Sequence, residues 1–279
     1  MARRRESSAG CRTGAFAVLS TLVFGSIAWG QANAPAPTPV MPAPFSRDCQ
    51  IGTDPVATRS PLPNVAAALQ KRKAIKILAI GASASAGRRS TRGGHTGEAR
   101  QILQQAIKGL DVVMINRGVS GELAANAAAR IKTEVALSEP DMVLWQVGTN
   151  DALAYVPLDE LETTVVDTVR WLKEHNVDVV LVGLQYVDRM EQDGNYTAAR
   201  ELMRKIAAKE NVMIVRRPEA QRLLSQAAVS GGGLFPDEFE RSEAGYVCLA
   251  EYLARAITLG VFGGDLQPRP PSQPLRPQN

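Results

Sequence analysis

Short runs of consecutive apolar residues recur along the chain, and stretches with helical spacing of apolar residues separate them. Apolar runs of this length, without polar alternation, are typical of strands that are buried on both faces of a parallel sheet. The predicted strands are residues 75–80, 111–115, 142–147, 177–182 and 212–215. The predicted helices are residues 98–110, 122–137, 158–174, 197–209 and 243–259.

This alternation of strands and helices predicts the α/β fold class, as a three-layer α/β/α sandwich with a parallel sheet of about five strands. The helical pattern is well developed in residues 158–174, where Leu161, Val165, Val169 and Leu172 recur at intervals of three or four. In such sheets the ligand sites collect at the carboxyl ends of the strands. The residues that follow the predicted strands are therefore the candidates for chemistry.

The segments outside this pattern differ in composition. An apolar stretch over residues 14–29 is preceded by Arg3, Arg4, Arg5 and Arg12, and small residues follow it. This predicts a signal peptide over residues 1–32, with an uncleaved membrane anchor as the alternative. The stretch has roughly 16 residues against the ~20 that a bilayer needs, which favours cleavage. We expect a Pro-rich linker and N-terminal arm over 33–73, the folded domain over 74–262 and a disordered tail over 263–279.

The net charge of +4 depends on the predicted leader, which holds four arginines and one glutamate, so the chain without it would carry +1. No stripe of Lys and Arg with interleaved aromatic residues follows the leader, so no nucleic-acid partner is expected. We expect an exported protein, periplasmic or secreted, with no stable membrane span after signal cleavage. The pattern leaves its oligomeric state open.

Two cysteines, Cys49 and Cys248, remain once the leader that contains Cys11 is removed. An even pair in an oxidising compartment favours a disulfide, and the alternative is two free thiols with Cys248 buried on a helix.

Three residues follow predicted strands and fit the chemistry of acyl transfer. Ser83 comes after Gly81 in a strand-to-loop turn, where a hydroxyl can act as a nucleophile. The backbone N–H of Gly121 and the side-chain amide of Asn150 can stabilise an oxyanion. Each residue also has a plain alternative: Ser83 as one of several loop serines, Gly121 as a turn glycine, and Asn150 as an Asx-turn or N-cap residue.

The order of these motifs resembles the signature blocks of the SGNH (GDSL-type) hydrolases over residues 75–259. The blocks are Ile-Gly-Ala-Ser at 80–83, Asn-Arg-Gly-Val-Ser-Gly-Glu at 116–122, and Gly-Thr-Asn-Asp at 148–151, followed by Gly245-Tyr246. The resemblance implies the flavodoxin-like α/β/α fold of that family. It implies Ser83 as the nucleophile, the N–H groups of Ser83 and Gly121 with the Asn150 amide as the oxyanion hole, and Asp237 as the acid of the triad. Ala82 departs from the Asp that the family usually has after the glycine.

The fourth block departs at the position of the catalytic histidine. The family pattern is Asp-x-x-His, whereas this chain has Asp237-Glu238-Phe239-Glu240. Glu240 therefore stands where the base is expected, and like-charge repulsion from Asp237 could raise its pKa toward a useful range. The chain has only two histidines, and neither has an Asp three residues before it. We interpret His95 as a mobile, exposed residue of a Gly-rich surface loop and His175 as a residue that interacts with a helix C-terminus.

The leading hypothesis is a serine ester hydrolase with a degenerate triad, acting on an acyl ester that is a small molecule or an O-acetylated carbohydrate. The alternative is a catalytically inactive protein of the same fold that binds a glycan or acyl ligand, and an acyltransferase is a third option. No cofactor or metal is expected, because the acidic residues around Asp237 have no His or Cys near them in sequence.

Overall fold

The computed structural model describes residues 49, 57–58, 60–72, 74–81, 94–107, 109–185, 188–217 and 242–263. The chain divides into two compact units, Met1–Pro35 and Ala36–Asn279, and every described residue belongs to the second unit. The predicted signal peptide, and the predicted tail after its first residue, therefore lie outside the described residues.

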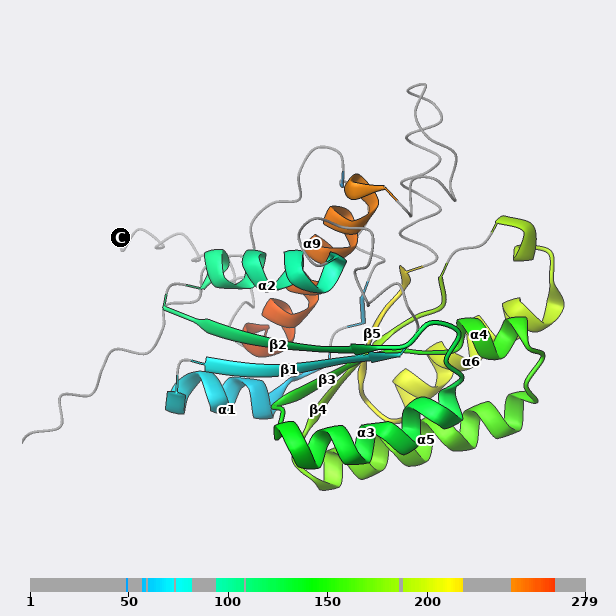
Figure 1. The fold of residues 1–279 in the computed structure, drawn as a ribbon, viewed down its shortest axis with the longest axis horizontal. Helices are drawn as coiled ribbons and strands as arrows, with labels where there is room; N and C mark the ends of the chain where they lie inside the picture. Colours follow the sequence, from blue (N-terminus) through cyan, green and yellow to red (C-terminus); the bar gives the residue numbers. More distant parts are fainter. Residues whose placement is uncertain are drawn as a thin grey trace, which may run out of the picture. The chain divides into compact units, whose positions relative to one another are not determined.

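The described residues form a five-stranded parallel sheet in the order β2-β1-β3-β4-β5 (Figure 1). The strands are β1 (Ala74–Gly81), β2 (Asp111–Gly118), β3 (Met142–Gln146), β4 (Asp178–Val182) and β5 (Met213–Val215). This confirms the predicted α/β class and the parallel sheet. The strand order reverses between β1 and β3, and in doubly wound sheets the ligand crevice lies at the carboxyl ends of two such strands.

Helices cover both faces of the sheet (Figure 1). On one face lie α2 (Gly94–Ala106) and α9 (Glu243–Phe262), and on the other lie α3 (Ala124–Ser138), α5 (Leu158–Glu174) and α6 (Gly194–Lys209). The predicted bounds of α5 are confirmed, whereas α2 begins four residues earlier than predicted. Three elements were not predicted: α1 (Pro63–Arg72), α4 (Thr149–Leu153) and the 3-10 turn η3 (Asp188–Met190).

The sheet separates two apolar clusters, and the side chains of β3 show how the sequence builds both. All five residues of this strand are buried, and so are all five residues of β4. Met142 and Leu144 belong to the cluster that contains α2 and α9, whereas Val143 and Trp145 belong to the cluster that contains α3, α5 and α6. Continuous apolar strands form because each face of the sheet has its own core.

Helix α1 lies within the segment that the sequence predicts as an arm, and it packs on the core through Val65, Ala68 and Leu69. The carboxylate of Asp178, at the start of β4, accepts hydrogen bonds from the Asn64 side chain at 2.8 Å and from the Val65 N–H at 2.9 Å. Asp178 thereby satisfies a backbone N–H of the first turn of α1, as an N-cap residue would. Burial raises the pKa of Asp178 above its usual value.

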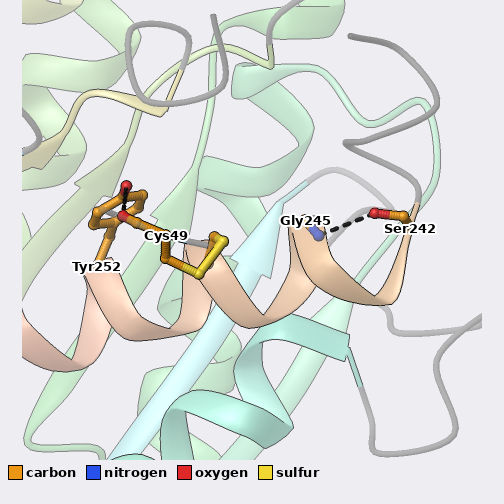
Figure 2. Close-up of a disulfide and its surroundings, with 5 residues drawn as sticks. Cys49, Ser242, Gly245 and Tyr252 are labelled. Carbon is orange, nitrogen blue, oxygen red and sulfur yellow. Dashed lines mark hydrogen bonds between the residues drawn. A yellow bond between two sulfur atoms is a disulfide. The ribbon is translucent and has the colours of Figure 1, made fainter. Parts of the chain in front are cut away.

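Helix α9 is fixed at both its start and its middle (Figure 2). The Ser242 hydroxyl accepts a hydrogen bond from the Gly245 N–H at 3.1 Å and so caps the helix. A disulfide joins Cys248 to Cys49 with a Cα–Cα distance of 5.1 Å, which confirms the predicted pair. The Tyr252 hydroxyl donates to the Cys49 carbonyl at 2.6 Å, so the helix holds residue 49 by two different bonds.

Residues Ala244–Phe262 of α9 are long and apolar enough to cross a membrane by length and composition. This helix is part of the apolar core of the folded domain, where Cys248, Leu249, Tyr252 and Leu253 are buried. Its apolar composition therefore has a structural reason, because it packs against α2 and the sheet.

Candidate functional site

The carboxyl ends of β2, β1 and β3 lie in one row. Gly81 of β1 is in register with Gly118 of β2 on one side and with Gln146 of β3 on the other. The Gly81 carbonyl accepts a hydrogen bond from the Val119 N–H at 2.8 Å, so the chain leaving β2 stays close to the end of β1. Gly81 has a φ of +113°, and a Cβ atom there would lie 2.0 Å from the Gln146 carbonyl oxygen. This position therefore requires glycine.

Gly121 lies in the turn between β2 and α3, at the same edge of the sheet. Its φ of +75° is in the left-handed region that glycine adopts without strain. The residue is exposed, and its N–H has no hydrogen bond to another residue in the described part of the chain. An exposed, fixed N–H of this kind is suited to bind an oxyanion.

Asn150 lies in the short helix α4, directly after β3. Its Nδ2 donates a hydrogen bond to the Glu122 carbonyl at 2.9 Å, so the side chain reaches the turn that contains Gly121. Asn150 is not the N-cap of α4, because that position is Gly148, so the N-cap interpretation of Asn150 is wrong. The side-chain amide has two N–H groups, and the bond to Glu122 uses one of them. The second and third sequence motifs therefore meet in the fold.

Asp151 also joins these two motifs, although no role for it was predicted. Its carboxylate accepts a hydrogen bond from the Ala124 N–H, the first residue of α3, at 2.9 Å. Burial raises the pKa of Asp151, and the bond from the Ala124 N–H partly opposes this shift. The carboxylate lies at the positive end of the α3 dipole, which favours its charge.

The turn before α3 is held from its other side by Arg130. Its guanidinium donates to the Glu122 carboxylate at 2.7 Å and to the Arg117 carbonyl at 2.5 Å. The Glu122 side chain has only 3% of its surface exposed, so this ion pair is shielded from solvent on the acidic side. Arg130, Asn150 and Asp151 together fix the backbone around Gly121.

Three of the predicted site residues, Ser83, Asp237 and Glu240, lie outside the described residues. Their assignments stay predictions. The adjoining described residues are Gly81, two positions before Ser83, and Ser242, two positions after Glu240.

The interpretation of His95 as an exposed loop residue is wrong. Helix α2 begins at Gly94, so His95 lies in its first turn, and its exposed fraction is 1%. The neighbouring Thr96 is buried too and accepts a hydrogen bond from the Asn116 side chain of β2 at 3.3 Å. The Gly-rich sequence predicted a loop, but packing of α2 against α9 and β2 buries its first turn.

The prediction that His175 interacts with a helix C-terminus is confirmed. It is the C-cap residue of α5, and its Nδ1 lies 2.7 Å from the Trp171 carbonyl. Its ring also stacks on Trp171. Among the described residues, no group of three or more His, Cys, Asp or Glu side chains lies close enough together to hold a metal ion.

Comparison with known proteins agrees with this geometry. The model of the non-GDSL lipase-like family matches residues 48–262. The chain is 26% identical to an acetylxylan esterase of Geobacillus stearothermophilus over 173 residues, which are 56% of this chain and 77% of that protein. It is 29% identical over 77 residues to an arylesterase of Vibrio mimicus, a match that covers 28% of this chain and 38% of that protein.

Solved structures show the same fold. A variant of an acetyl xylan esterase from Geobacillus stearothermophilus superposes with a TM-score of 0.51 and 24% identity, over 67% of this chain and 94% of that chain. A protein named as a GDSL-like lipase from Parabacteroides merdae superposes with a TM-score of 0.55 and 18% identity, over 66% of this chain and 96% of that chain. The family match extends from the residue before Cys49 to the end of α9 and includes every sequence motif, so this chain belongs to the non-GDSL lipase-like family.

Proposed function

We propose that this protein is a serine esterase that hydrolyses an acyl ester, with Ser83 as the nucleophile. The observation that carries the proposal is the bond from the Asn150 amide to the Glu122 carbonyl, because it unites two motifs of acyl transfer at one sheet edge. Ser83 follows Gly81, the last residue of β1, and Gly81 belongs to the same edge. The N–H groups of Ser83 and Gly121 and the second N–H of Asn150 would bind the oxyanion.

In the proposed reaction, Glu240 accepts the proton of the Ser83 hydroxyl as the serine oxygen attacks the ester carbonyl. The tetrahedral intermediate collapses, and the alcohol leaves with the proton that Glu240 held. Water then attacks the acyl-serine and gives a proton to Glu240. When this second tetrahedral intermediate collapses, the carboxylic acid leaves and the Ser83 oxygen takes the proton back from Glu240, which restores both residues. Asp237 lies three residues before Glu240, and its charge would raise the pKa of Glu240. An ordinary carboxylate is a weak base for a hydroxyl, so the reaction should be slow.

We propose an O-acetylated carbohydrate as the substrate, because the Geobacillus stearothermophilus relative is named an acetylxylan esterase. The test is release of acetate from acetylated xylo-oligosaccharides and from 4-nitrophenyl acetate by the full chain and by Ser83→Ala. We expect turnover by the wild type that Ser83→Ala removes. Equal acetate release by both proteins would contradict Ser83 as the nucleophile.

We further propose that the protein is exported, since residues 1–32 have the composition of a signal peptide and a disulfide joins Cys49 to Cys248. N-terminal sequencing of protein from the periplasm or medium tests this proposal. A mature N-terminus near residue 33 is expected, and intact protein confined to the cytoplasm would contradict it.

A further inference from the structure

The carboxyl end of β3 holds a side-chain amide that makes no hydrogen bond with the described part of the chain. Gln146 is only 3% exposed, and neither its Oε1 nor its Nε2 has a hydrogen-bond partner among the described residues. A buried amide without partners costs free energy, so native proteins rarely keep one unless something else occupies its hydrogen bonds. Gln146 therefore needs an explanation outside the packing of the core.

The position of Gln146 in the sheet points to a ligand. It is the last residue of β3 and lies in register with Gly81, the last residue of β1, so it stands at the point where the strand order reverses. Crevices that bind ligands in doubly wound sheets form at this point. Gln146 also precedes Gly148 and Asn150 by two and four residues.

The sheet neighbours of Gln146 offer its side-chain amide no polar side chain. Side chains alternate along a strand, so Gln146 shares the face of Leu144, the side of the sheet that α2 and α9 cover. In its row, β4 contributes Val182, while β1 and β2 contribute Gly81 and Gly118. The two glycines of this row have no side chain, and Val182 is apolar.

We propose that Gln146 is a specificity-determining residue, whose amide binds a free hydroxyl group in the alcohol part of the substrate. An amide presents an acceptor and two donors, and a hydroxyl can satisfy both kinds of group. An acyl chain offers neither, and the ester carbonyl oxygen offers only an acceptor. The substrate alcohol is then a polyol or carbohydrate that keeps a free hydroxyl beside its acyl group. This inference rests on the proposed esterase function.

The test measures binding without turnover, in the full chain with Ser83→Ala, by calorimetric titration. The probes are a mono-acetylated methyl xyloside, which keeps free hydroxyls, and the fully acetylated methyl xyloside, which has none. We expect Gln146→Leu to weaken binding of the first probe about tenfold, as loss of one hydrogen-bonding group does, and to change binding of the second by less than about twofold. The matched control is Met142→Leu, because Met142 lies on the same face of β3 at the opposite end of the strand. This variant should change the binding of neither probe.

Thermal unfolding adds a readout that does not depend on binding. If the amide is unpaired in the free protein, Gln146→Leu should raise Tm by about 2 °C or more. A fall in Tm with unchanged binding would show a structural amide, paired through an ordered water, and would overturn the proposal. The proposal would also be overturned if Gln146→Leu weakened the binding of both probes equally, or if the parent protein did not bind the mono-acetylated probe. Failure of the esterase function would instead show as absence of Ser83-dependent acetate release.

Discussion

The Asn150 side chain donates a hydrogen bond to the Glu122 backbone carbonyl at 2.9 Å, across 28 residues of sequence. This bond joins α4, which follows β3, to the turn after β2 at the edge where β1 also ends. It holds one N–H of the amide and so fixes the direction of the other. The proposed oxyanion site depends on this relationship.

Replacement of Asn150 by alanine should therefore lower kcat for acetyl-ester hydrolysis by about 10²–10³-fold, the range for loss of one oxyanion donor. KM should change little, because the interaction forms mainly in the transition state. Asn195→Ala is the matched control, since the Asn195 Nδ2 also donates to a carbonyl, that of Ala152, at 2.9 Å. Similar losses of kcat in both variants would show that Asn150 acts through local structure alone.

Asp151 should make stability depend on pH in a way that Asp151→Asn removes. Burial raises its pKa in the folded state, so the unfolded chain loses this proton first as the pH rises. The free energy of unfolding of the wild type relative to Asp151→Asn should then fall between the ordinary pKa of aspartate and the raised value. Urea unfolding of both proteins from pH 3 to 7 measures the difference. A difference that grows with pH would contradict this assignment.

The contribution of Glu210 to the free energy of unfolding should depend on pH with the opposite sign. The hydrogen bonds from Arg170 lower the pKa of Glu210, and its carboxylate has 2.7 Å and 3.2 Å contacts with that guanidinium. Its contribution is present above the ordinary pKa of glutamate and is lost as the pH falls through the lowered value. The stability of the wild type relative to Glu210→Gln should therefore decrease in acid. No acid-dependent decrease would show that the pair contributes nothing measurable, as many exposed ion pairs do.

The disulfide should be a main source of stability for the N-terminal arm. Cys49 and Cys248 are 199 residues apart, and the loop-entropy model gives up to about 5 kcal/mol for a loop of this size. Reduction, or the double variant Cys49→Ser with Cys248→Ser, should lower Tm. Reductant should have no further effect on the double variant. An unchanged Tm after verified reduction would contradict the prediction.

The sequence was sufficient to place the five strands because each contains a local apolar run, although β2 continues past its run to Gly118. The apolar run 179–182 of β4 and the helical spacing of α5 need no information from elsewhere in the chain. Helix α1 was not predicted, because its start depends on Asp178, more than a hundred residues away. Helix α4 has five residues, too few for a periodic pattern to separate it from a loop.

The candidate site was predictable to the extent that its motifs follow strands. The positions of Gly121 and Asn150 could be placed at one edge from the sequence, but the bond between Asn150 and Glu122 could not. The burial of His95 was missed because its flanking glycines predict a loop, whereas the packing of α2 decides its exposure. The sequence did not indicate a role for Gln146, because a single polar residue at the end of an apolar strand matches no functional motif.

The central claim is that Ser83 is an activated nucleophile at this edge of the sheet. Intact-mass analysis after incubation with a fluorophosphonate probe tests it most directly. We expect one adduct on the native wild type, mapped to Ser83 by peptide analysis, and none on Ser83→Ala or on heat-unfolded protein. Glu240→His should label faster by about 10²–10⁴-fold, the usual gain from a suitable general base, and Glu240→Ala more slowly. Absence of a Ser83 adduct on both the wild type and Glu240→His would contradict the account.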